Sequence, residues 1–445
     1  MNEKIFKAYD IRGVYPEDIN RDAAYMIGRA LVLYTGAKKV AVGYDMRESS
    51  PELEAGLISG IIDQGANAVR IGLSSTPMAY FASWKLDVDA SVVITASHNP
   101  AQWNGMKMCK KNAVPIGEGN GMEEIKGLAL KGEFTNVSEK GKIEENNELK
   151  KEYLDYIVGF FNKGLAKKKV VIDFANSMGI GDKDVYEKIS ENVEAIYMYD
   201  NFDGSFPNHE ANPLKTETLE ALRKRVVEEK ADLGIAYDGD ADRIGFVSEN
   251  GEIIPMDYMI ALLSEEILKK HPGGLILMDL RSSNAVKEVI EESGGKVNRC
   301  RVGHSLIKKQ MREDGAIFAG ELSGHYFFEE NSKAEMATLA AIMVINLLNE
   351  AGQKMSELVK NLKRYYHSGE INSDVEDKNG MMEKLKEIYN DGKLDESDGI
   401  RIDYPDWWFN VRPSNTEPKL RLNLEAKTKE LMEEKRDELL KLIRN

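Results

Sequence analysis

Short apolar runs alternate along the chain with longer segments whose apolar residues recur at helical spacing. Apolar runs bounded by turn residues are typical of buried strands, and helical spacing is typical of amphipathic helices. The first repeat of this pattern predicts helices over 21–34 and 51–64 and strands over 39–43, 69–71 and 90–94. Alternation of this kind predicts an α/β unit.

Two further repeats of the pattern follow. The second predicts helices over 150–161, from 182 onward and over 216–230, with strands over 170–174, 195–199 and 233–237. A hairpin over 246–254, with its turn at Glu249-Asn250-Gly251, leads into the third. The third repeat predicts strands over 275–278, 296–300 and 316–319, helices over 284–292 and 305–313, and a long helical run over 334–362.

The last part of the chain has a different pattern. A strand, a helix, a Trp-rich hairpin over 400–425 and a charged terminal helix predict an α+β domain. The stretch 117–147 is polar and rich in Gly, Lys and Glu, as expected of a domain edge or a long loop. We therefore expect three successive α/β domains with mixed sheets plus a C-terminal α+β domain, over 1–147, 148–248, 249–362 and 363–445.

Composition narrows the classes of protein that the chain can be. A length of 445 residues suggests about three domains, and 60 Lys and Arg against 75 Asp and Glu give a net charge of −15, which opposes nucleic-acid binding. Cys109 and Cys300 show no metal-ligand or redox spacing, which favours a reducing compartment. The amino terminus lacks a signal-like apolar region, and the apolar stretch 339–348 is too short to span a bilayer. We expect a cytoplasmic protein with no nucleic-acid or membrane partner.

The clearest candidate for chemistry follows the predicted strand 90–94, in the sequence Thr95-Ala96-Ser97-His98-Asn99-Pro100. Active sites of open α/β sheets lie at the carboxyl ends of strands, and a turn at Asn99-Pro100 would expose the Ser97 hydroxyl beside N–H groups that can face an anion. Ser97 is therefore a candidate nucleophile, with a plain capping role as the structural alternative. Arg12, beside Gly13, is an ordinary surface charge taken alone, but an anion contact if it lies near a phosphate site.

A second candidate is Asp238-Gly239-Asp240-Ala241-Asp242-Arg243, which follows the predicted strand 233–237. In extended backbone the three alternating carboxylates would lie on one side, which fits a divalent cation such as Mg²⁺. An EF-hand calcium loop is a rival interpretation, since Glu249 has the spacing of the last ligand in that loop. Arg243 stands where that loop needs Gly, and a strand precedes it, so Mg²⁺ is favoured. A solvated acidic turn is the other alternative.

Two more loops carry groups that could bind a sugar phosphate. Glu321 and Ser323, between two glycines and followed by His325, offer the carboxylate and hydroxyl needed to bind adjacent sugar hydroxyls. A proline-bounded loop later in the chain has the composition of a phosphate clamp, with a guanidinium, two hydroxyls and an amide: Arg412, Ser414, Asn415 and Thr416. Each loop taken alone could equally be an ordinary turn.

The four loops together resemble the α-D-phosphohexomutase family, most closely its bacterial phosphomannomutase/phosphoglucomutase branch. The resemblance covers nearly the whole chain, with one motif in each expected domain, and implies four domains around a central cleft. It implies that Ser97 carries a transferable phosphoryl group. It also implies a Mg²⁺ site with four ligands: Ser97, Asp238, Asp240 and Asp242.

The same resemblance implies the groups that move protons and contact substrate. Lys107, in Asn104-Gly105-Met106-Lys107, matches a family lysine that assists proton transfer, and His325 matches an acid/base. Glu321 and Ser323 would contact sugar hydroxyls. The non-reacting phosphate would contact the clamp loop: Arg412, Ser414, Asn415 and Thr416. Three further residues would line the cleft: Tyr9, Arg12 and His304.

The implied activity is interconversion of hexose 1-phosphate and hexose 6-phosphate, for mannose, glucose or both. It would proceed through a phosphoserine and a hexose 1,6-bisphosphate, which is both intermediate and activator. Mg²⁺ and Arg243 would neutralise charge in the transition state of phosphoryl transfer. The expected partner is a small phosphosugar, and the chain would be a monomer or a homodimer.

The chain departs from the family pattern at two places. Ala241 stands where the family usually has Gly, and Asn331-Ser332-Lys333-Ala334-Glu335 stands where relatives commonly carry an Arg-Trp pair and paired acids. Phosphoglucosamine mutase, which usually has Gln at the position of Leu322, is the nearest competing function. A phosphosugar phosphatase and a non-catalytic sugar-phosphate-binding protein are rivals from other classes.

Overall fold

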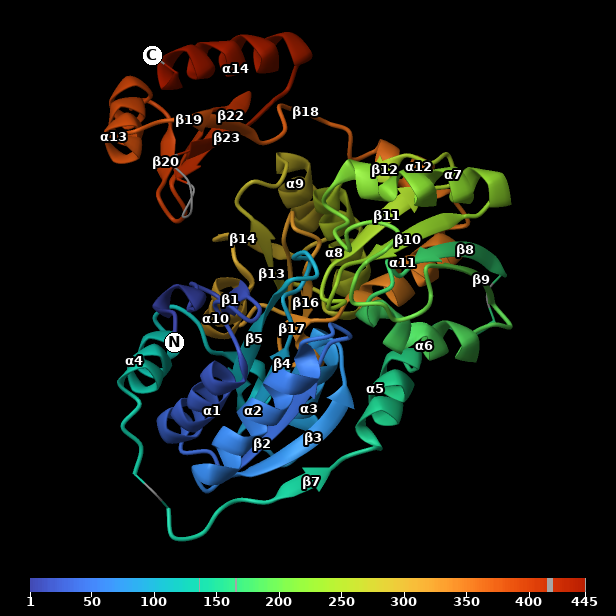
Figure 1. Cartoon of the computed structure of the whole chain (residues 1–445). Helices are drawn as coiled ribbons and strands as arrows, with labels where there is room; N and C mark the ends of the chain where they lie inside the picture. The colour runs from blue at the N-terminus through green and yellow to red at the C-terminus, as the bar shows by residue number, and fades with distance from the viewer. Residues whose placement is uncertain (136, 165, 414–418, 445) are drawn as a thin grey trace.

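The chain forms four sheet-based domains in the order expected from the sequence (Figure 1). The computed structural model describes residues 1–135, 137–164, 166–413 and 419–444. Each of the first three domains has a mixed sheet with helices packed on it, and the fourth has an antiparallel sheet. The predicted fold class, three α/β domains followed by an α+β domain, is confirmed.

The first sheet has the strand order β1–β5–β4–β2–β3–β7, with β6 beside β5. Its strands are β1 (Ile11–Val14), β2 (Lys39–Tyr44), β3 (Asn67–Leu73), β4 (Ala90–Ile94), β5 (Trp103–Lys110), β6 (Val114–Pro115) and β7 (Ile143–Glu145). Its helices are α1 (Arg21–Thr35), α2 (Ser50–Asp63), α3 (Thr76–Lys85) and α4 (Met122–Lys131). Strands β2 and β4 are parallel neighbours, whereas β5 runs antiparallel to β4. The carboxyl end of β4, which precedes Ser97, therefore lies in the middle of the sheet.

Glycines allow α1 and α2 to pack closely on this sheet. A Cβ on Gly60 would lie 2.1 Å from the carbonyl oxygen of Tyr25, and a Cβ on Gly28 would lie 2.4 Å from that of Leu57. Any larger residue would force the two helices apart, because both contacts are with backbone atoms. Helix α2 also contacts β2, whose carboxyl end precedes residues of the site.

The second and third sheets combine parallel strands with an antiparallel hairpin. The second, β12–β11–β10–β8–β9, contains β8 (Lys168–Asp173), β9 (Val193–Met198), β10 (Leu233–Tyr237), β11 (Ile244–Ser248) and β12 (Ile253–Ile254), with α5 (Leu149–Val158), α6 (Lys183–Lys188) and α7 (Glu220–Glu229). The third, β14–β13–β15–β16–β17, contains β13 (Leu275–Asp279), β14 (Lys296–Cys300), β15 (Phe318–Gly320), β16 (Tyr326–Phe328) and β17 (Ala334–Glu335). Its helices are α8 (Met256–Lys270), α9 (Asn284–Glu292), α10 (His304–Asp314), α11 (Ala337–Ala351) and α12 (Met355–Lys360).

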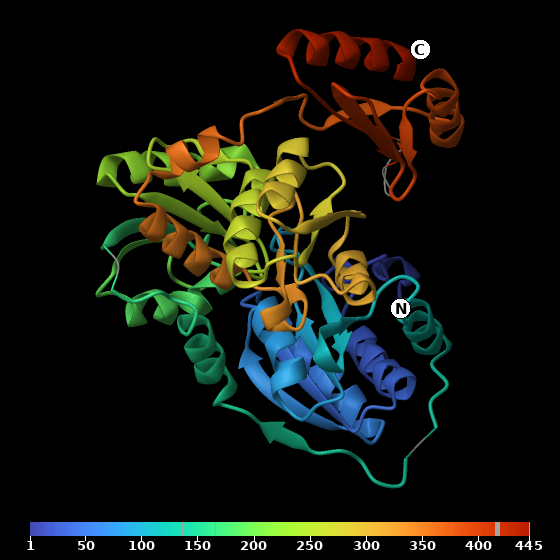
Figure 2. The same ribbon diagram turned by 180° about the vertical axis from the view of Figure 1, so that it is seen from behind.

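The fourth domain lies at one end of the molecule, and a single segment after α12 connects it to the rest (Figures 1 and 2). Its strands are β18 (Tyr366–His367), β19 (Ile371–Asp374), β20 (Lys393–Asp395), β21 (Ile400–Asp403), β22 (Trp407–Pro413) and β23 (Lys419–Ala426), with helices α13 (Lys378–Ile388) and α14 (Lys429–Ile443). It has an apolar core of its own, whereas one continuous core joins the second and third domains to part of the first.

Three features differ from the sequence expectations. The stretch 117–147 is not a plain loop, because it forms α4 and the edge strand β7 of the first sheet. The helical run predicted over 334–362 is a strand and two helices, which separate at Gly352, where φ is 61°. The second sheet extends to β12, beyond the boundary expected after residue 248. Among the residues described, no helix is both long enough and apolar enough to cross a bilayer.

Candidate active site

Ser97 lies on the turn after β4, buried where the first and second domains meet. Its backbone has φ 52°, in the left-handed region that a serine seldom adopts. The hydroxyl donates to Oδ2 of Asp238 across 3.2 Å and lies 3.3 Å from Nδ1 of His98. The serine and the acidic sequence, which are far apart in the chain, therefore meet in space.

Arg47, a buried side chain that follows β2, holds the Ser97 turn in place. Its guanidinium donates to four backbone carbonyl oxygens, those of Ser97 (2.8 Å), Asn99 (2.7 Å), Pro100 (2.7 Å) and Trp103 (3.0 Å). Its Nε donates to the carboxylate of Asp45 at 3.1 Å. All the N–H donors of the guanidinium are thus used, and most of them fix the backbone around the serine.

Asp238, Asp240 and Asp242 are fully buried, and one carboxylate oxygen from each lies within 4.8 Å of the other two. The extended backbone predicted for them is wrong: the segment after β10 is a tight turn with Ala241 at φ 57°. The turn gathers the carboxylates, and Ala241 stands at a left-handed position that favours glycine. A Cβ on Gly239 would lie 2.1 Å from the carbonyl oxygen of Ser97, so glycine lets the two loops touch.

The groups around these carboxylates fit a divalent cation. Lys107 on β5 donates to Oδ2 of Asp240 at 2.6 Å and to Oδ2 of Asp242 at 2.5 Å, and Thr76 also donates to Asp240. Within the described residues, Oδ1 of Asp240 is buried without a hydrogen-bond partner. Burial, and then the charges of Asp240 and Asp242, raise the pKa of Asp238 well above its usual value. Carboxylate oxygens, one of them unpaired, are the kind of ligand that Mg²⁺ prefers, although the Lys107 ammonium already contacts two of the three acids.

The predicted sugar loop after β15 is a hydrogen-bonded cluster. Glu321 accepts from the N–H of Gly303 at 2.9 Å and from Oγ of Ser323 at 2.6 Å, and lies 2.9 Å from Nδ1 of His325. The other ring nitrogen of His325, Nε2, lies 3.2 Å from Oδ1 of Asp242. Although burial opposes its charge, Asp242 and Glu321 raise the pKa of His325 to about 9. The imidazole ring of His325 therefore connects the sugar loop to the acidic turn.

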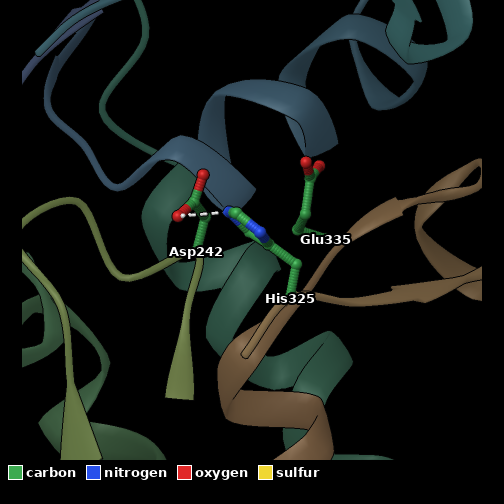
Figure 3. Close-up of side chains that lie close together, drawn as sticks. All are labelled: Asp242, His325 and Glu335. Carbon is green, nitrogen blue, oxygen red and sulfur yellow. Dashed lines mark hydrogen bonds and ion pairs between the residues drawn. The ribbon is translucent and has the colours of Figure 1, made fainter. Parts of the chain in front are cut away.

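Figure 3 shows Glu335, on β17, beside the pair formed by Asp242 and His325. One ligand atom from each of these three residues falls within 4.8 Å of the others. Each acid already has an ammonium partner, because Lys308 on α10 donates to both oxygens of Glu335 at 3.0 and 3.1 Å and Lys107 contacts Asp242. We interpret the group as a buried ion-pair network that extends from the acidic turn into the third domain.

A cavity of 340 Å³ opens beside these groups and is lined by all four domains. Seven predicted site residues line it: Tyr9, Arg243, His304, Glu321, Ser323, His325 and Arg412. Arg243, at 3.7 Å from Asp238, connects the cavity wall to the acidic turn. Arg12 instead donates to Asn99 of the Ser97 turn, at 2.8 Å. The predicted clamp residues Ser414, Asn415 and Thr416 lie outside the described residues.

The atypical stretch Asn331 to Glu335 attaches the third domain to the first. Asn331 accepts from Nε1 of Trp84 on α3 at 2.9 Å, and its amide donates to the carbonyl of Glu335 at 2.8 Å. Arg312 donates to the carbonyl oxygens of Ser332 at 2.6 Å and Asn112 at 2.9 Å. These residues therefore form an inter-domain contact.

Sequence reasoning missed several residues of the site. Arg47 follows β2, a neighbour of β4, so the rule that placed Ser97 at a strand end also applies to it. Thr76 and Lys308 carry no sequence signal, because a lone hydroxyl or lysine on a helix reveals nothing of its burial. Arg281, after β13, lines the cavity and contacts Asp279.

Comparison with known proteins gives matches over the whole chain. Models of phosphoglucomutase/phosphomannomutase alpha/beta/alpha domains I, II and III match residues 3–136, 151–251 and 255–366, and that of the C-terminal domain matches 370–442. A phosphomannomutase from Methanocaldococcus jannaschii is 41% identical over 443 residues, 99% of this chain and 97% of that protein. A phosphomannomutase from Vibrio cholerae is 37% identical and covers 99% of this chain and 98% of its own.

A solved structure extends the match to three dimensions. The crystal structure of a phosphoglucomutase/phosphomannomutase family protein from Burkholderia thailandensis has a TM-score of 0.90 at 30% identity, covering 99% of this chain and 98% of that one. The family resemblance seen in the sequence is thereby confirmed, domain by domain and over the full length. The chain belongs to the phosphoglucomutase/phosphomannomutase family of mutase enzymes.

Proposed function

We propose that the protein interconverts the 1-phosphate and 6-phosphate of mannose, glucose or both through a phosphoryl group on Ser97 and a hexose 1,6-bisphosphate. Its relatives support phosphohexomutase activity. The observation that carries the finer proposal is the 3.2 Å contact between Oγ of Ser97 and Asp238, next to a cavity lined by sugar- and phosphate-binding groups. A buried hydroxyl in this setting can give and receive a phosphoryl group.

Each half-reaction exchanges one oxygen–phosphorus bond for another. The bond from phosphorus to Oγ of Ser97 breaks while a bond forms to the free hydroxyl oxygen of the bound hexose phosphate. The hydroxyl proton ends on Oγ of Ser97, and we assign His325 and Lys107 to this transfer. His325 can take the proton only in its neutral form, which its raised pKa makes the minor form at neutral pH. The bisphosphate then turns end for end, and the reverse step returns its other phosphoryl group to Ser97.

We propose that Ser97, Asp238, Asp240 and Asp242 hold Mg²⁺. When bound, Mg²⁺ neutralises charge on the transferred phosphoryl group. Arg243 adds a fixed positive charge at the cavity wall. The burial of Ser97 excludes water, which disfavours hydrolysis of the phosphoserine.

Substrate contacts would come from three parts of the cavity. Ser323 donates to Glu321, and adjacent sugar hydroxyls would replace that bond with bonds of their own. Tyr9, Arg12 and His304 would contact the sugar phosphate from the first and third domains. The clamp, Arg412 with Ser414, Asn415 and Thr416, would hold the non-reacting phosphate. A clamp on a separate domain from Ser97 allows the intermediate to bind in two orientations.

Turnover of hexose 1-phosphate by wild type and Ser97→Ala, with Mg²⁺ and the matching 1,6-bisphosphate, tests this function. Wild type should form hexose 6-phosphate, and Ser97→Ala should lose at least about a thousandfold in kcat, as expected when a nucleophile is removed. Phosphate released at the rate of turnover would instead indicate a phosphatase. Ligand binding without turnover in the wild type would indicate a binding protein, and faster turnover of glucosamine phosphates would indicate phosphoglucosamine mutase.

The sugar loop also predicts the choice of sugar. Glu321 and Ser323 can bind one pair of hydroxyls, and the family resemblance assigns these to O3 and O4, which have the same configuration in mannose and glucose. Strong discrimination at C2 would need a further polar group that the wrong sugar leaves unpaired. Turning the bisphosphate also moves C2 to another wall. We expect kcat/KM for the two 1-phosphates within about a hundredfold, and a preference of about 10⁴ would contradict this.

A further inference from the structure

Three guanidinium groups converge on one carboxylate at the cavity wall of the fourth domain. Oε2 of Glu370 lies 3.0 Å from Nη2 of Arg412 and 3.6 Å from Nη1 of Arg281, and Oε1 lies 3.7 Å from Nη1 of Arg421. The three arginines all line the 340 Å³ cavity. Glu370 therefore contacts the same cations that a substrate phosphate would need.

The backbone fixes this convergence. Arg412 and Arg421 are direct cross-strand partners on β22 and β23. Glu370 immediately precedes β19, whose first residue pairs with β23. Arg281 comes from the loop after β13 in the third domain. The carboxylate thus lies where the connecting segment enters the fourth domain, and it contacts arginines of both domains.

The carboxylate of Glu370 does not pair with all the N–H donors of the three arginines. Two of its three arginine contacts are longer than a hydrogen bond. Nε of Arg412 and Nε of Arg421 are buried and have no hydrogen-bond partner in the part of the chain that the structure describes. A phosphate group has a second charge and more acceptor oxygens, so it would pair with more of these donors.

Glu370 is nonetheless held as an anion. Burial opposes its charge, but the guanidiniums of Arg412, Arg281 and Arg421 outweigh this effect and keep the pKa of its carboxyl below the usual value. Its side chain is 31% exposed, so it has room to move toward solvent. An exposed, charged and incompletely paired carboxylate can give up its place to a stronger anion.

We propose that Glu370 is a displaceable counter-anion of Arg412, Arg421 and Arg281. Glu370 pairs with these arginines when no phosphate is bound and is displaced by each phosphate that enters. The inference rests on the proposed function, in which the bisphosphate must leave the clamp and return in the other orientation. When phosphate leaves, Glu370 pairs with the arginines once more. This lowers the free-energy cost of each release, because no partly buried cation is left without a partner.

The alternative is that Glu370 stays in place and only orients the arginines around a bound phosphate. The two arrangements predict opposite results when its charge is removed. A competing carboxylate weakens phosphate binding, so its loss strengthens binding. An orienting carboxylate supports phosphate binding, so its loss weakens binding.

Calorimetric titration with inorganic phosphate distinguishes a displaceable Glu370 from one that stays in place. Glu370→Gln should bind phosphate at least about fivefold more tightly than wild type, the gain from removing one like charge at contact distance in water. Glu376→Gln, in the same domain, exposed and with the same change in net charge, should leave the Kd unchanged. Adding Arg412→Ala to Glu370→Gln should abolish the gain, which places the phosphate at the clamp. An equal or weaker affinity in Glu370→Gln overturns the proposal.

Turnover gives a second readout. Glu370→Gln should lower both KM and kcat for hexose 1-phosphate, since a tighter hold on phosphate slows reorientation; a raised KM would contradict this. Phosphate titration needs no catalysis, so it tests the inference even if Ser97→Ala shows the proposed function to be wrong. If Glu370→Gln does not fold, Glu370→Asp can replace it, because the shorter side chain moves the carboxylate away from the arginines. Glu370→Asp should also bind phosphate more tightly than wild type. An unchanged or higher Kd would overturn the proposal equally.

Discussion

Ser97 has a backbone conformation that costs a serine about 1 to 3 kcal/mol, and its neighbours hold it there. Arg47 fixes the carbonyl oxygens around it, and Gly239 lets the acidic turn press against its own carbonyl. Strain of this kind persists only where the surroundings over-determine the conformation. We therefore expect Arg47 to control the reactivity of Ser97 although it does not line the cavity.

Arg47→Lys should lower kcat by roughly a hundredfold with little change in KM. A lysine has three donors and cannot reach all four carbonyl oxygens, and a small displacement of a reacting group is enough for a loss of about this size. Steady-state kinetics and a circular dichroism spectrum of the variant check the prediction. Arg225→Lys, an exposed arginine paired with Glu229, is the matched control. A kcat equal to that of wild type would show that the turn holds without Arg47.

Asp240→Asn should sharply lower kcat and raise the Mg²⁺ concentration needed for half-maximal activity. A neutral amide is a weaker ligand for Mg²⁺ and also leaves Lys107 with one carboxylate fewer. A Mg²⁺ titration of activity measures both effects, with the exposed Asp200→Asn as control. Wild-type kcat at saturating Mg²⁺ would mean that the acidic turn does not serve the reaction.

At this scale the sequence was informative where chemistry demands an unusual composition. Three acids on alternate positions, or a proline-bounded loop with a guanidinium and hydroxyls, stand out from ordinary turns. The sequence did not predict how the three acids are arranged, because they meet through a turn at Ala241 and not through strand alternation. Glu370 and Lys308 gave no signal, since their roles depend on partners from distant parts of the chain.

At the scale of elements, a buried chain of hydrogen bonds joins α5, α6, β10 and α11. Thr338 on α11 donates to Asp182, the residue just before α6. Asp182 also accepts from Tyr153 on α5 at 3.4 Å. Tyr237 at the end of β10 lies 3.0 Å from Thr338 and 2.6 Å from the hydroxyl of Tyr186. This chain connects the second and third domains directly behind the acidic turn.

Stability should respond to pH through Asp182. Burial raises the pKa of its carboxyl to about 6, so the folded state binds a proton more tightly than the unfolded state. The contribution of Asp182 to the free energy of unfolding is fully present below about pH 4 and is lost as the pH rises through about 6. The change amounts to about 2 to 3 kcal/mol. Asp182→Asn should remove that part of the pH dependence.

Urea unfolding of wild type and Asp182→Asn at several pH values measures this difference. The variant should gain stability relative to wild type between about pH 4 and pH 7. Asp184→Asn, an exposed acid two positions away, should follow the wild-type curve. Parallel pH curves for wild type and Asp182→Asn would contradict the assignment.

Element prediction worked where burial imposes a strong pattern. β4 and β10 were found as continuous apolar runs because both faces of these strands are covered. The edge strand β7 was missed, since Ile143 is exposed and the other two residues of the strand, Glu144 and Glu145, are acids. The helical run after 334 was overextended because Gly352, rather than any change of composition, ends α11.

At the scale of the molecule, the fourth domain is tied to the third mainly by polar contacts. Arg299 donates to both oxygens of Asp403 at 2.7 and 2.9 Å, and Glu425 accepts from the N–H of Asn284 at 2.9 Å. Its apolar core is separate from that of the other domains. Motion of one domain against another is the default expectation for interfaces of this kind.

Arg412→Ala should remove the guanidinium of the proposed clamp on this fourth domain. We expect a loss of about 2 to 5 kcal/mol in transition-state stabilisation, as for a desolvated charge pair that loses one member. Kinetics with hexose 1-phosphate and with hexose 6-phosphate should show the loss in both directions. Arg436→Ala on α14, whose partly exposed side chain pairs with Asp437, should show none. A defect with only one of the two substrates would contradict a clamp used in both orientations.

The central claim is that Ser97 carries the phosphoryl group that moves between the two ends of the sugar. The most direct measurement is a single turnover of enzyme labelled with radioactive phosphate from a hexose 1,6-bisphosphate, with the label first located by peptide mass analysis. On mixing with unlabelled hexose 1-phosphate, the label should leave Ser97 at least as fast as kcat and enter hexose bisphosphate and monophosphate. Label that stays on Ser97 during turnover, or emerges as inorganic phosphate at that rate, would contradict the account.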